Sequence, residues 1–306
     1  MMAPSPIIRL SKVSKSFKDV QAIKDLSFTV SKGEIVGLLG PNGAGKTTVV
    51  RLINGVIAAD AGTVEIFGQS PLAESNSIRS RTGVLTESAG LYGHMTAKEN
   101  LAFFARIYGV QDYPSRIDML LQEFGLAEYK DRKAETFSTG MRKRLGIAKA
   151  LIHRPDVLFL DEPTTGLDPE ASRDLLGYIK ELNARDGVTI VLATHLLRQV
   201  QELCHRFLFL HRGQLIESGT LRQLEDKYLK SFQVKVESDL KVEGPSYRGF
   251  PLQQVEPGVL IFTVETKSQV PELLRQILSE ASVYSAEILG RDLETLYFNV
   301  RGNFRG

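Results

Sequence analysis

A short segment, residues 40–48, combines glycines with a lysine and two threonines in a spacing suited to binding phosphate. It reads Gly-Pro-Asn-Gly-Ala-Gly-Lys-Thr-Thr, the G-x-x-x-x-G-K-T pattern of a P-loop. Glycines let the backbone curl so that its N–H groups face the crowded negative charges of a nucleoside triphosphate. Lys46 can reach the β- and γ-phosphates, and the Thr47 hydroxyl can ligate Mg²⁺. The predicted nucleotide-binding residues are Gly40, Pro41, Asn42, Gly43, Ala44, Gly45, Lys46, Thr47 and Thr48.

The residues on either side of this loop have the patterns that a P-loop requires. Residues 34–39, Glu-Ile-Val-Gly-Leu-Leu, predict a short buried strand, and residues 47–53, Thr-Thr-Val-Val-Arg-Leu-Ile, predict a helix with an apolar face. Strand, loop and helix is the arrangement of the motif, and the helix adds the positive end of its dipole to the phosphate site. The alternative is a glycine-rich turn that merely carries a lysine.

Two adjacent carboxylates end a second apolar run farther along the chain. Residues 157–160, Val-Leu-Phe-Leu, predict a buried strand that leads directly into Asp161 and Glu162. Asp161 is placed to hold Mg²⁺ together with Thr47, and Glu162 can polarise a water molecule toward the γ-phosphate. A strand followed by a solvated acidic turn would have the same local pattern. The P-loop upstream favours the catalytic interpretation.

A third motif, which begins at residue 137, carries a family resemblance. It reads Phe-Ser-Thr-Gly-Met-Arg-Lys-Arg-Leu and is similar to the signature loop and helix of ABC-type ATPases, whose usual form is Leu-Ser-Gly-Gly-Gln. Ser138 and Gly140 match that form, and Phe137, Thr139 and Met141 depart from it. The serine hydroxyl and the backbone N–H groups at a helix start form an anion site, which these departures leave in place. A simple helix cap at Ser138 is the alternative.

Other elements of the ABC pattern follow in the same order. By this resemblance Phe17 stacks on adenine, Asp168 belongs to the loop that couples two sites, and His195 contacts the γ-phosphate. Stacking of an aromatic side chain on a base is worth about 1–3 kcal/mol in nucleic-acid sites. The plainer alternatives are an ordinary strand aromatic for Phe17, a turn before a helix for Asp168 and a structural histidine for His195.

One position differs from the family pattern. After the predicted strand 82–85, ABC-type ATPases usually have a glutamine whose side chain meets the metal and the attacking water, and here Glu87 is the nearest match. A carboxylate can also serve Mg²⁺, so we expect Glu87 to be a metal ligand beside Thr47 and Asp161. Glu87 would add negative charge near the phosphates, and a solvated loop residue is the alternative.

Hydrophobic patterning indicates how these motifs are positioned. Residues 7–36 alternate apolar and polar positions and predict antiparallel strands, whereas residues 97–153 have a helical pattern. Three continuous apolar runs suit strands buried on both faces of a parallel sheet, at 157–160, 189–193 and 207–210. Helices are expected at 170–185 and 196–204. Residues 7–230 are therefore predicted to be an α/β P-loop ABC ATPase domain, with an antiparallel β subdomain, a parallel-sheet core and a helical subdomain.

The pattern changes near residues 226–230, and residues 231–306 predict a small C-terminal α+β domain. This segment contains no recognisable catalytic cluster. Its predicted strands lie at 232–237, 259–265 and 283–289, with a helix at 270–278. Residues 293–302 resemble the closing helix of the C-terminal extension found in ABC subunits that serve exporters of drugs, lipids, polysaccharides or ions. The resemblance favours export over import.

Composition limits the setting in which the chain works. Its 306 residues carry a net charge of +2, which gives no argument for nucleic-acid binding. No apolar run reaches the ~20 residues of a membrane span, and the start has no signal-peptide core. The single cysteine, Cys204, fits a reducing cytosol, and we expect it to fill a helix interface. A cytoplasmic location, peripheral to the inner face of the membrane, is expected.

The resemblance implies that ATP and Mg²⁺ are held between two such subunits, a homodimer or a heterodimer, arranged head to tail. Closure of the dimer would drive a separate transmembrane permease, docked on residues 86–110, including Leu91, Tyr92 and Phe103. Two alternatives are a soluble ABC-type ATPase not coupled to transport and a regulatory nucleotide-binding module. The first usually carries a coiled coil, a zinc insert or a second ATPase unit, none of which appears. The retained catalytic residues argue against the second.

Overall fold

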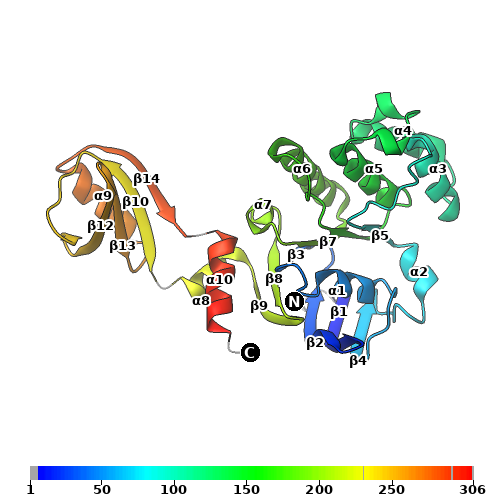
Figure 1. Ribbon diagram of the computed structural model, residues 1–306, viewed down its shortest axis with the longest axis horizontal. Helices are drawn as coiled ribbons and strands as arrows, with labels where there is room; N and C mark the ends of the chain where they lie inside the picture. The colour runs from blue at the N-terminus through cyan, green and yellow to red at the C-terminus, as the bar shows by residue number, and fades with distance from the viewer. Residues whose placement is uncertain (1–5, 230, 291, 305–306) are drawn as a thin grey trace. The chain divides into compact units, whose positions relative to one another are not determined.

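The computed structural model describes residues 6–229, 231–290 and 292–304 (Figure 1). The chain forms two compact units, one up to Ser218 and one from Gly219 onward. The predicted domain boundary at 230/231 stays a prediction, and helix α8 (Leu221–Tyr228) belongs to the second unit because it contacts helix α10 (Leu293–Asn303). Among the described residues no helix is both long and apolar enough to cross a membrane.

A six-stranded sheet forms the centre of the first unit. Its order is β5-β6-β7-β3-β8-β9. The strands are β5 (Thr82–Leu85), β6 (Val157–Asp161), β7 (Thr189–Thr194), β3 (Ile35–Leu39), β8 (Arg206–His211) and β9 (Gln214–Gly219). The pairs from β5 to β8 are parallel, and every residue of β3, β6 and β7 is buried. The continuous apolar runs of the sequence are therefore strands covered on both faces, as predicted.

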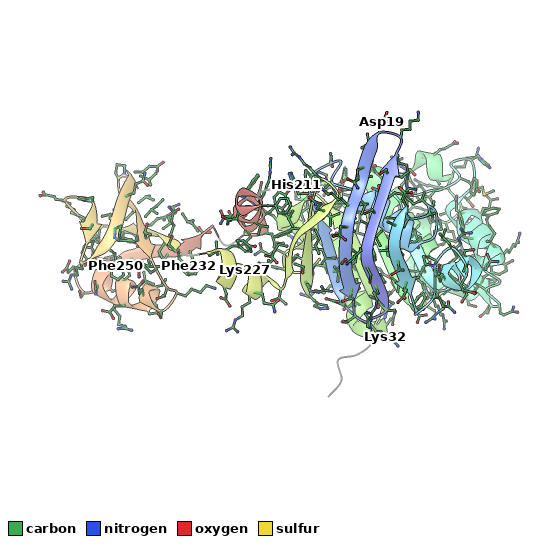
Figure 2. All side chains as sticks on the ribbon, turned by 90° about the horizontal axis from the view of Figure 1, so that it is seen from below. Asp19, Lys32, His211, Lys227, Phe232 and Phe250 are labelled. Carbon is green, nitrogen blue, oxygen red and sulfur yellow. The ribbon has the colours of Figure 1, made fainter. Side chains whose placement is uncertain are left out.

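A three-stranded antiparallel sheet adds a second layer. It consists of β2 (Val20–Val30), β1 (Ile8–Phe17) and β4 (Ala61–Ile66), and the turn between β1 and β2 carries Asp19 (Figure 2). Helix α1 (Lys46–Ile53) follows the P-loop. Its buried residues Val49 and Leu52 join one hydrophobic core with residues of β1, β2 and the parallel strands. This shared core fixes α1, and with it the P-loop, against two sheets.

The helical subdomain lies between β5 and β6 in the sequence. Its main helices are α3 (Ala97–Ile107), α4 (Tyr113–Glu123) and α5 (Thr139–Leu151), with α2 (Ser75–Arg79) before β5 and short 3-10 turns η1 (Ala127–Tyr129) and η2 (Ala134–Thr136) before α5. Figure 1 shows α3, α4 and α5 grouped together, with α5 against β5. Thr96 and Glu99 form a capping box that begins α3. The helical pattern predicted for residues 97–153 and the predicted α/β architecture of this unit are confirmed.

The prediction of a helix at 196–204 is wrong in its length. Helix α6 (Pro169–Asp186) agrees with its prediction, but α7 spans only Leu197–Val200. The chain then rejoins the sheet, because the His205 N–H donates to Ile35 O at 2.9 Å and the Ile35 N–H donates to His205 Nδ1 at 3.0 Å. Cys204 therefore lies against the sheet rather than in a helix interface. A Cβ added to Gly37 of β3 would lie 3.1 Å from Cys204 Sγ.

The second unit is an α+β domain with its own core. A five-stranded sheet has the order β11-β12-β13-β10-β14, with antiparallel pairs throughout. Its elements are β10 (Phe232–Ser238), β11 (Ser246–Tyr247), β12 (Phe250–Glu256), β13 (Val259–Val264), α9 (Gln269–Leu278) and β14 (Val283–Leu289). Buried residues of β10, β13 and α9, among them Val234, Phe262 and Leu273, form its core. Helix α10 ends the described chain at the position predicted for a closing helix.

Candidate nucleotide-binding and catalytic site

The P-loop joins the end of β3 to the start of α1, and close backbone packing requires glycine at two of its positions. A Cβ on Gly40 would lie 2.4 Å from Leu210 O, which is backbone and cannot give way. Gly45 has φ 104°, and a Cβ there would approach Ala22 O to 2.9 Å. Left-handed backbone with a neighbouring carbonyl at this distance excludes any larger residue. The loop therefore leaves its N–H groups and the N-terminus of α1 at one edge of the parallel sheet.

Lys46 holds its ammonium inside the curve of this loop. The side chain is 6% exposed, and Nζ donates to Gly40 O at 2.8 Å and to Pro41 O at 3.2 Å. The Glu162 carboxylate oxygen Oε1 lies 3.4 Å away. A buried charge is tolerated only when it is paired and hydrogen-bonded, and these oxygens meet that condition. The ammonium thus sits between the phosphate loop and the end of β6.

Asp161 has one oxygen bonded and one oxygen free. The Thr47 hydroxyl donates to Oδ2 at 2.8 Å, whereas Oδ1 is buried and has no hydrogen-bond partner. Burial raises the pKa of Asp161 above its ordinary value, and the hydrogen bond from Thr47 only partly opposes this shift. A buried acceptor without a donor fits a hard cation, because Mg²⁺ takes a hydroxyl and one or two carboxylates together with phosphate and water oxygens. The two side chains suit the magnesium role predicted for them.

No cluster of three or more His, Cys, Asp and Glu side chains suitable for a metal ion occurs within residues 6–229, 231–290 and 292–304. Phosphate and water oxygens, rather than a protein cage, complete the coordination of Mg²⁺ at nucleotide sites.

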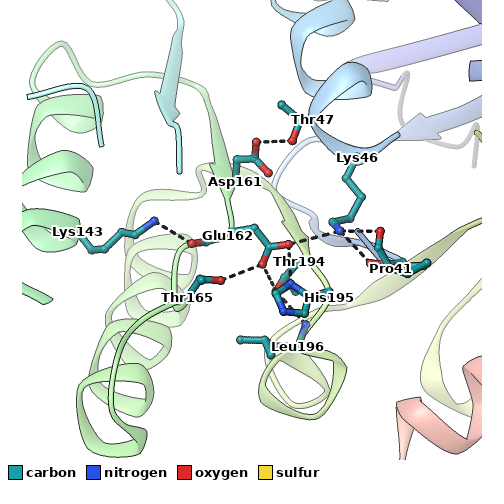
Figure 3. A network of polar contacts seen from close by, with 11 residues as sticks. Pro41, Lys46, Thr47, Lys143, Asp161, Glu162, Thr165, Thr194, His195 and Leu196 are labelled. Carbon is teal, nitrogen blue, oxygen red and sulfur yellow. Dashed lines mark hydrogen bonds and ion pairs between the residues drawn. The ribbon is translucent and has the colours of Figure 1, made fainter. Parts of the chain in front are cut away.

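Glu162 is the most extensively held side chain of the site (Figure 3). Thr194 Oγ1 donates to its Oε2 at 2.9 Å and Thr165 Oγ1 donates to the same oxygen at 3.2 Å. His195 Nδ1 lies 2.9 Å from Oε1. Burial alone would raise the pKa of Glu162, but the hydrogen bonds from His195 and Thr194 and the charge of Lys46 outweigh it, so the pKa is lowered. The carboxylate is ionised and oriented, as a base for water must be.

Glu87 faces both sides of the site. It lines a pocket of ≈ 560 Å³ together with P-loop residues, Glu162 and His195. It also lines an adjoining cleft of ≈ 730 Å³ with Thr47 and Asp161. Glu87, an exposed residue, therefore lines both the pocket with the predicted base and the cleft with the predicted metal ligands.

The structure brings most of the predicted residues together. The pocket of ≈ 560 Å³ is lined by Asn42, Gly43, Gly45, Lys46, Thr47, Thr48, Glu87, Glu162, Thr165 and His195, and by residues of β2 and Arg212. Most of these residues follow the carboxyl ends of parallel strands of the central sheet, where ligands of open α/β sheets bind. Phe17, at the end of β1, is 43% exposed, with Lys15 Nζ 5.5 Å from its ring centroid. Phe17 is not among the described residues that line the pocket.

The predicted signature residues lie apart from this pocket. Ser138 accepts a hydrogen bond from the Met141 N–H at 3.2 Å and caps α5, and Asp168 accepts one from the Ala171 N–H at 2.8 Å and caps α6. Gly140 and Asp168 line a small hollow of ≈ 210 Å³ of their own. Both helix starts leave free N–H groups. Within one chain these groups do not face the P-loop.

Sequence reasoning missed several residues of the site. Thr165, Thr194, Arg212 and Lys143 were not among the predicted site residues, although Thr194 directly precedes His195. Lys143 carried a usable signal, because it lies four and seven residues before the buried Ile147 and Ala150 of α5. A lysine on the apolar face of a helix must find oxygen partners inside the protein.

The fold and this set of side chains define a P-loop nucleotide-binding protein. The model of the ABC transporter family matches residues 23–165. The ABC transporter ATP-binding protein NatA of Bacillus subtilis (strain 168) is 40% identical over 225 residues, 71% of this chain and 91% of NatA. The chain therefore belongs to the ABC transporter family, among its ATP-binding subunits.

Other relatives and solved structures agree. YdbJ, an uncharacterized ABC transporter ATP-binding protein of the same Bacillus, is 35% identical over 94% of this chain and 93% of its own length. A solved ATP-binding subunit of an ABC transporter has a TM-score of 0.67 at 31% identity and covers 72% of this chain and 93% of that one. The dimeric cassette MJ0796, solved in a post-hydrolysis state with ADP and Pi, has a TM-score of 0.66 at 26% identity, over 70% of this chain and 99% of its own. Subunits of this family bind ATP, and the family members are ATPases that dimerise and act with membrane permeases.

Proposed function

We propose that this chain hydrolyses Mg-ATP as one half of a dimer and thereby drives a membrane permease. The observation that carries the proposal is that Lys46 and Glu162 line the P-loop pocket while Asp161 is hydrogen-bonded to Thr47 of the same pocket. Ser138 and Gly140 lie elsewhere in the chain. The P-loop set supplies phosphate binding, metal binding and a base. The signature set supplies anion-binding N–H groups with no phosphate site beside them, which supports a complementary second copy.

Each residue has a distinct role in the proposed reaction. The loop N–H groups and Lys46 bind the triphosphate, and Thr47, Asp161 and Glu87 hold Mg²⁺, which neutralises phosphate charge when bound. Glu162 accepts hydrogen-bond donation from the attacking water and takes its proton. The His195 ring, held at Glu162 Oε1, keeps this carboxylate oriented and contacts the γ-phosphate. Phe17 supports the adenine.

Two copies related by a two-fold axis would form two complete sites. Ser138 and Gly140 of one copy face the nucleotide on the P-loop of the other, and Asp168 lies in the loop that links the two sites. Either a homodimer or a heterodimer with a similar ATPase subunit satisfies this arrangement. Binding of ATP at both sites favours the closed pair, and hydrolysis removes that preference.

The permease contact is proposed for residues 86–110, where aromatic side chains gather. The Tyr92 ring centroid lies 5.0 Å from that of Phe103 and 6.2 Å from that of Phe104, and Tyr92 is 41% exposed. An aromatic cluster of this kind suits helix ends of a membrane partner. The chain would then work at the inner face of the membrane, on its cytoplasmic side.

Export is the proposed direction. The names of two relatives support this direction. Nod factor export ATP-binding protein I of Paraburkholderia xenovorans (strain LB400) is 40% identical to this chain. Bacitracin transport ATP-binding protein BcrA of Bacillus licheniformis is 36% identical. The resemblance of the C-terminal helix to that of exporter subunits supports the same direction.

The dimer is tested by dilution. We expect the specific ATPase activity of the purified chain to fall as the protein is diluted, because a lone copy lacks the signature groups opposite its P-loop. Dilution into an unrelated carrier protein at fixed total protein concentration provides the control for nonspecific loss. The two-copy site would be refuted if the specific activity stayed constant over a roughly hundredfold dilution that ends at a protein concentration well below the dimer Kd.

Replacement of Glu87 tests its predicted metal role. We expect Glu87→Gln to raise the Mg²⁺ concentration required for half-maximal hydrolysis by about 3- to 10-fold, because a neutral amide oxygen binds the cation less strongly than a carboxylate. A magnesium titration at saturating ATP measures the change. Glu128→Gln, at an exposed position of η1, is the matched control. An unchanged magnesium requirement would leave Glu87 as a solvated loop residue.

A further inference from the structure

Lys143 is a buried cation in α5, the helix that begins at the signature loop. Its side chain is 4% exposed. Nζ donates to the backbone carbonyl of Glu162 at 2.9 Å and to the backbone carbonyl of Glu87 at 2.8 Å (Figure 3 shows the first of these bonds). Lysine is rarely buried without such partners. One ammonium thus joins the signature helix, the first residue after β6 and the second residue after β5.

The hydrogen bond from Lys143 reaches Glu162 at a position with an uncommon backbone conformation. Glu162 has φ 49°, a left-handed conformation that a residue with a side chain keeps only when its surroundings hold it there. Its N–H donates to Ala193 O at 2.8 Å, and its carbonyl accepts from Lys143. Because both peptide groups are held, the direction in which the Glu162 side chain leaves the backbone is fixed.

The charge of Lys143 also suits this position. Burial lowers its pKa, and the carboxylates of Glu87, Asp161 and Glu162 favour the charged form and partly offset that effect. A cation beside three carboxylates reduces their mutual repulsion at the site. Lys143 has this effect from within the protein, because it is not one of the described residues that line the P-loop pocket.

A second lysine of α5 holds the same loop. Lys149 Nζ donates to Ala89 O at 2.6 Å and to Gly90 O at 3.2 Å, and it lies 5.1 Å from the centroid of the Phe104 ring. The loop from Glu87 to Gly90 is therefore fastened to α5 at both ends. The aromatic cluster of Tyr92, Phe103 and Phe104 follows this loop in the sequence, so a displacement of that cluster would be transmitted to α5 and to the carbonyl that Lys143 holds.

We propose that Lys143 is a positioning residue for hydrolysis. Its ammonium fixes the backbone of Glu162 and links it to the backbone of Glu87 in the neighbouring loop. The inference rests on the proposed ATPase function. Lys143 does not line the P-loop pocket and holds the backbone of the proposed base, so its loss should lower the rate of the chemical step and spare nucleotide binding.

The test compares three variants of the full chain. Lys143→Met keeps the length and apolar stem but removes the donors, and we expect kcat for ATP hydrolysis to fall about 10- to 100-fold while KM and nucleotide affinity change less than about 3-fold. Lys143→Arg keeps donors and should recover part of the rate. Arg116→Met is the matched control, because Arg116 is a half-buried cation that, like Lys143, donates to a backbone carbonyl, here Leu151 O at 2.8 Å at the far end of α5. It should lose comparable thermal stability and keep its kcat.

A double variant separates positioning from a general loss of structure. In the Glu162→Gln background, the further change Lys143→Met should lower the residual rate less than about 2-fold, because residues that act as a unit are not additive. The inference is overturned if Lys143→Met hydrolyses ATP at the wild-type rate, if its kcat falls no more than that of Arg116→Met, or if its effect is undiminished in the Glu162→Gln background. Failure of the wild-type chain itself to hydrolyse Mg-ATP at any protein concentration would instead refute the proposed function.

Discussion

Glu162→Gln is expected to reduce turnover to a small residual rate and leave ATP binding intact. The amide keeps the size of the side chain and its contacts with Thr165 and Thr194, but it cannot accept the proton of the attacking water. General-base catalysis contributes roughly 10²- to 10⁴-fold, so kcat should fall by about that factor. Phosphate release under saturating Mg-ATP measures the rate.

The same variant should also accumulate as a nucleotide-bound dimer. ATP that is bound and not cleaved keeps the two copies together, so size-exclusion chromatography with Mg-ATP should show a larger dimer fraction for Glu162→Gln than for the wild type. Glu181→Gln, an exposed carboxylate on α6, is the control and should behave as the wild type. Hydrolysis by Glu162→Gln at close to the wild-type rate would remove Glu162 from the role of base.

Lys46→Ala is expected to lose tight nucleotide binding. Hydrogen bonds to charged groups are worth about 1.5–3 kcal/mol, so the affinity for ATP should fall at least roughly 10- to 100-fold. The change also removes the cation 3.4 Å from Glu162 Oε1, so residual hydrolysis should be lost as well. Calorimetric titration with a non-hydrolysable ATP analogue measures the affinity.

The exposed Lys180 of α6 provides the comparison for that variant. Lys180→Ala removes the same charge from the same protein and should leave affinity and rate unchanged. If Lys46→Ala bound the analogue as tightly as the wild type, the P-loop assignment would have to be given up.

The sequence predicted those parts of the fold that are set by local pattern. The apolar runs of β6, β7 and β8 have the length and continuity of strands covered on both faces, and the G-x-x-x-x-G-K-T segment requires a strand before it and a helix after it. Asp161 and Glu162 were found because they end such a run. These inferences depend on residue types and spacing along the chain, which the sequence contains directly.

Other features depend on contacts between distant segments. Helix α7 is shorter than its pattern, because Ile35 and His205 exchange hydrogen bonds that draw the chain into the sheet. The partners of Lys143 are backbone carbonyls, which every residue has, so no residue type in the sequence marks them. The signature residues Ser138 and Gly140 were found by family resemblance, and the single chain gives them no phosphate to contact.

The buried position of Cys204 has a practical consequence for measuring the movement of two copies relative to each other. It is the one cysteine of the chain, it is 8% exposed, and burial raises the pKa of its thiol far above the ordinary value. A thiol that stays protonated and covered does not react with maleimides. Fluorophores or spin labels can therefore be attached at an introduced cysteine, for example Asp19→Cys on the β1–β2 turn, with the native sulfur left in place. Distances between labelled copies would then report opening and closing directly.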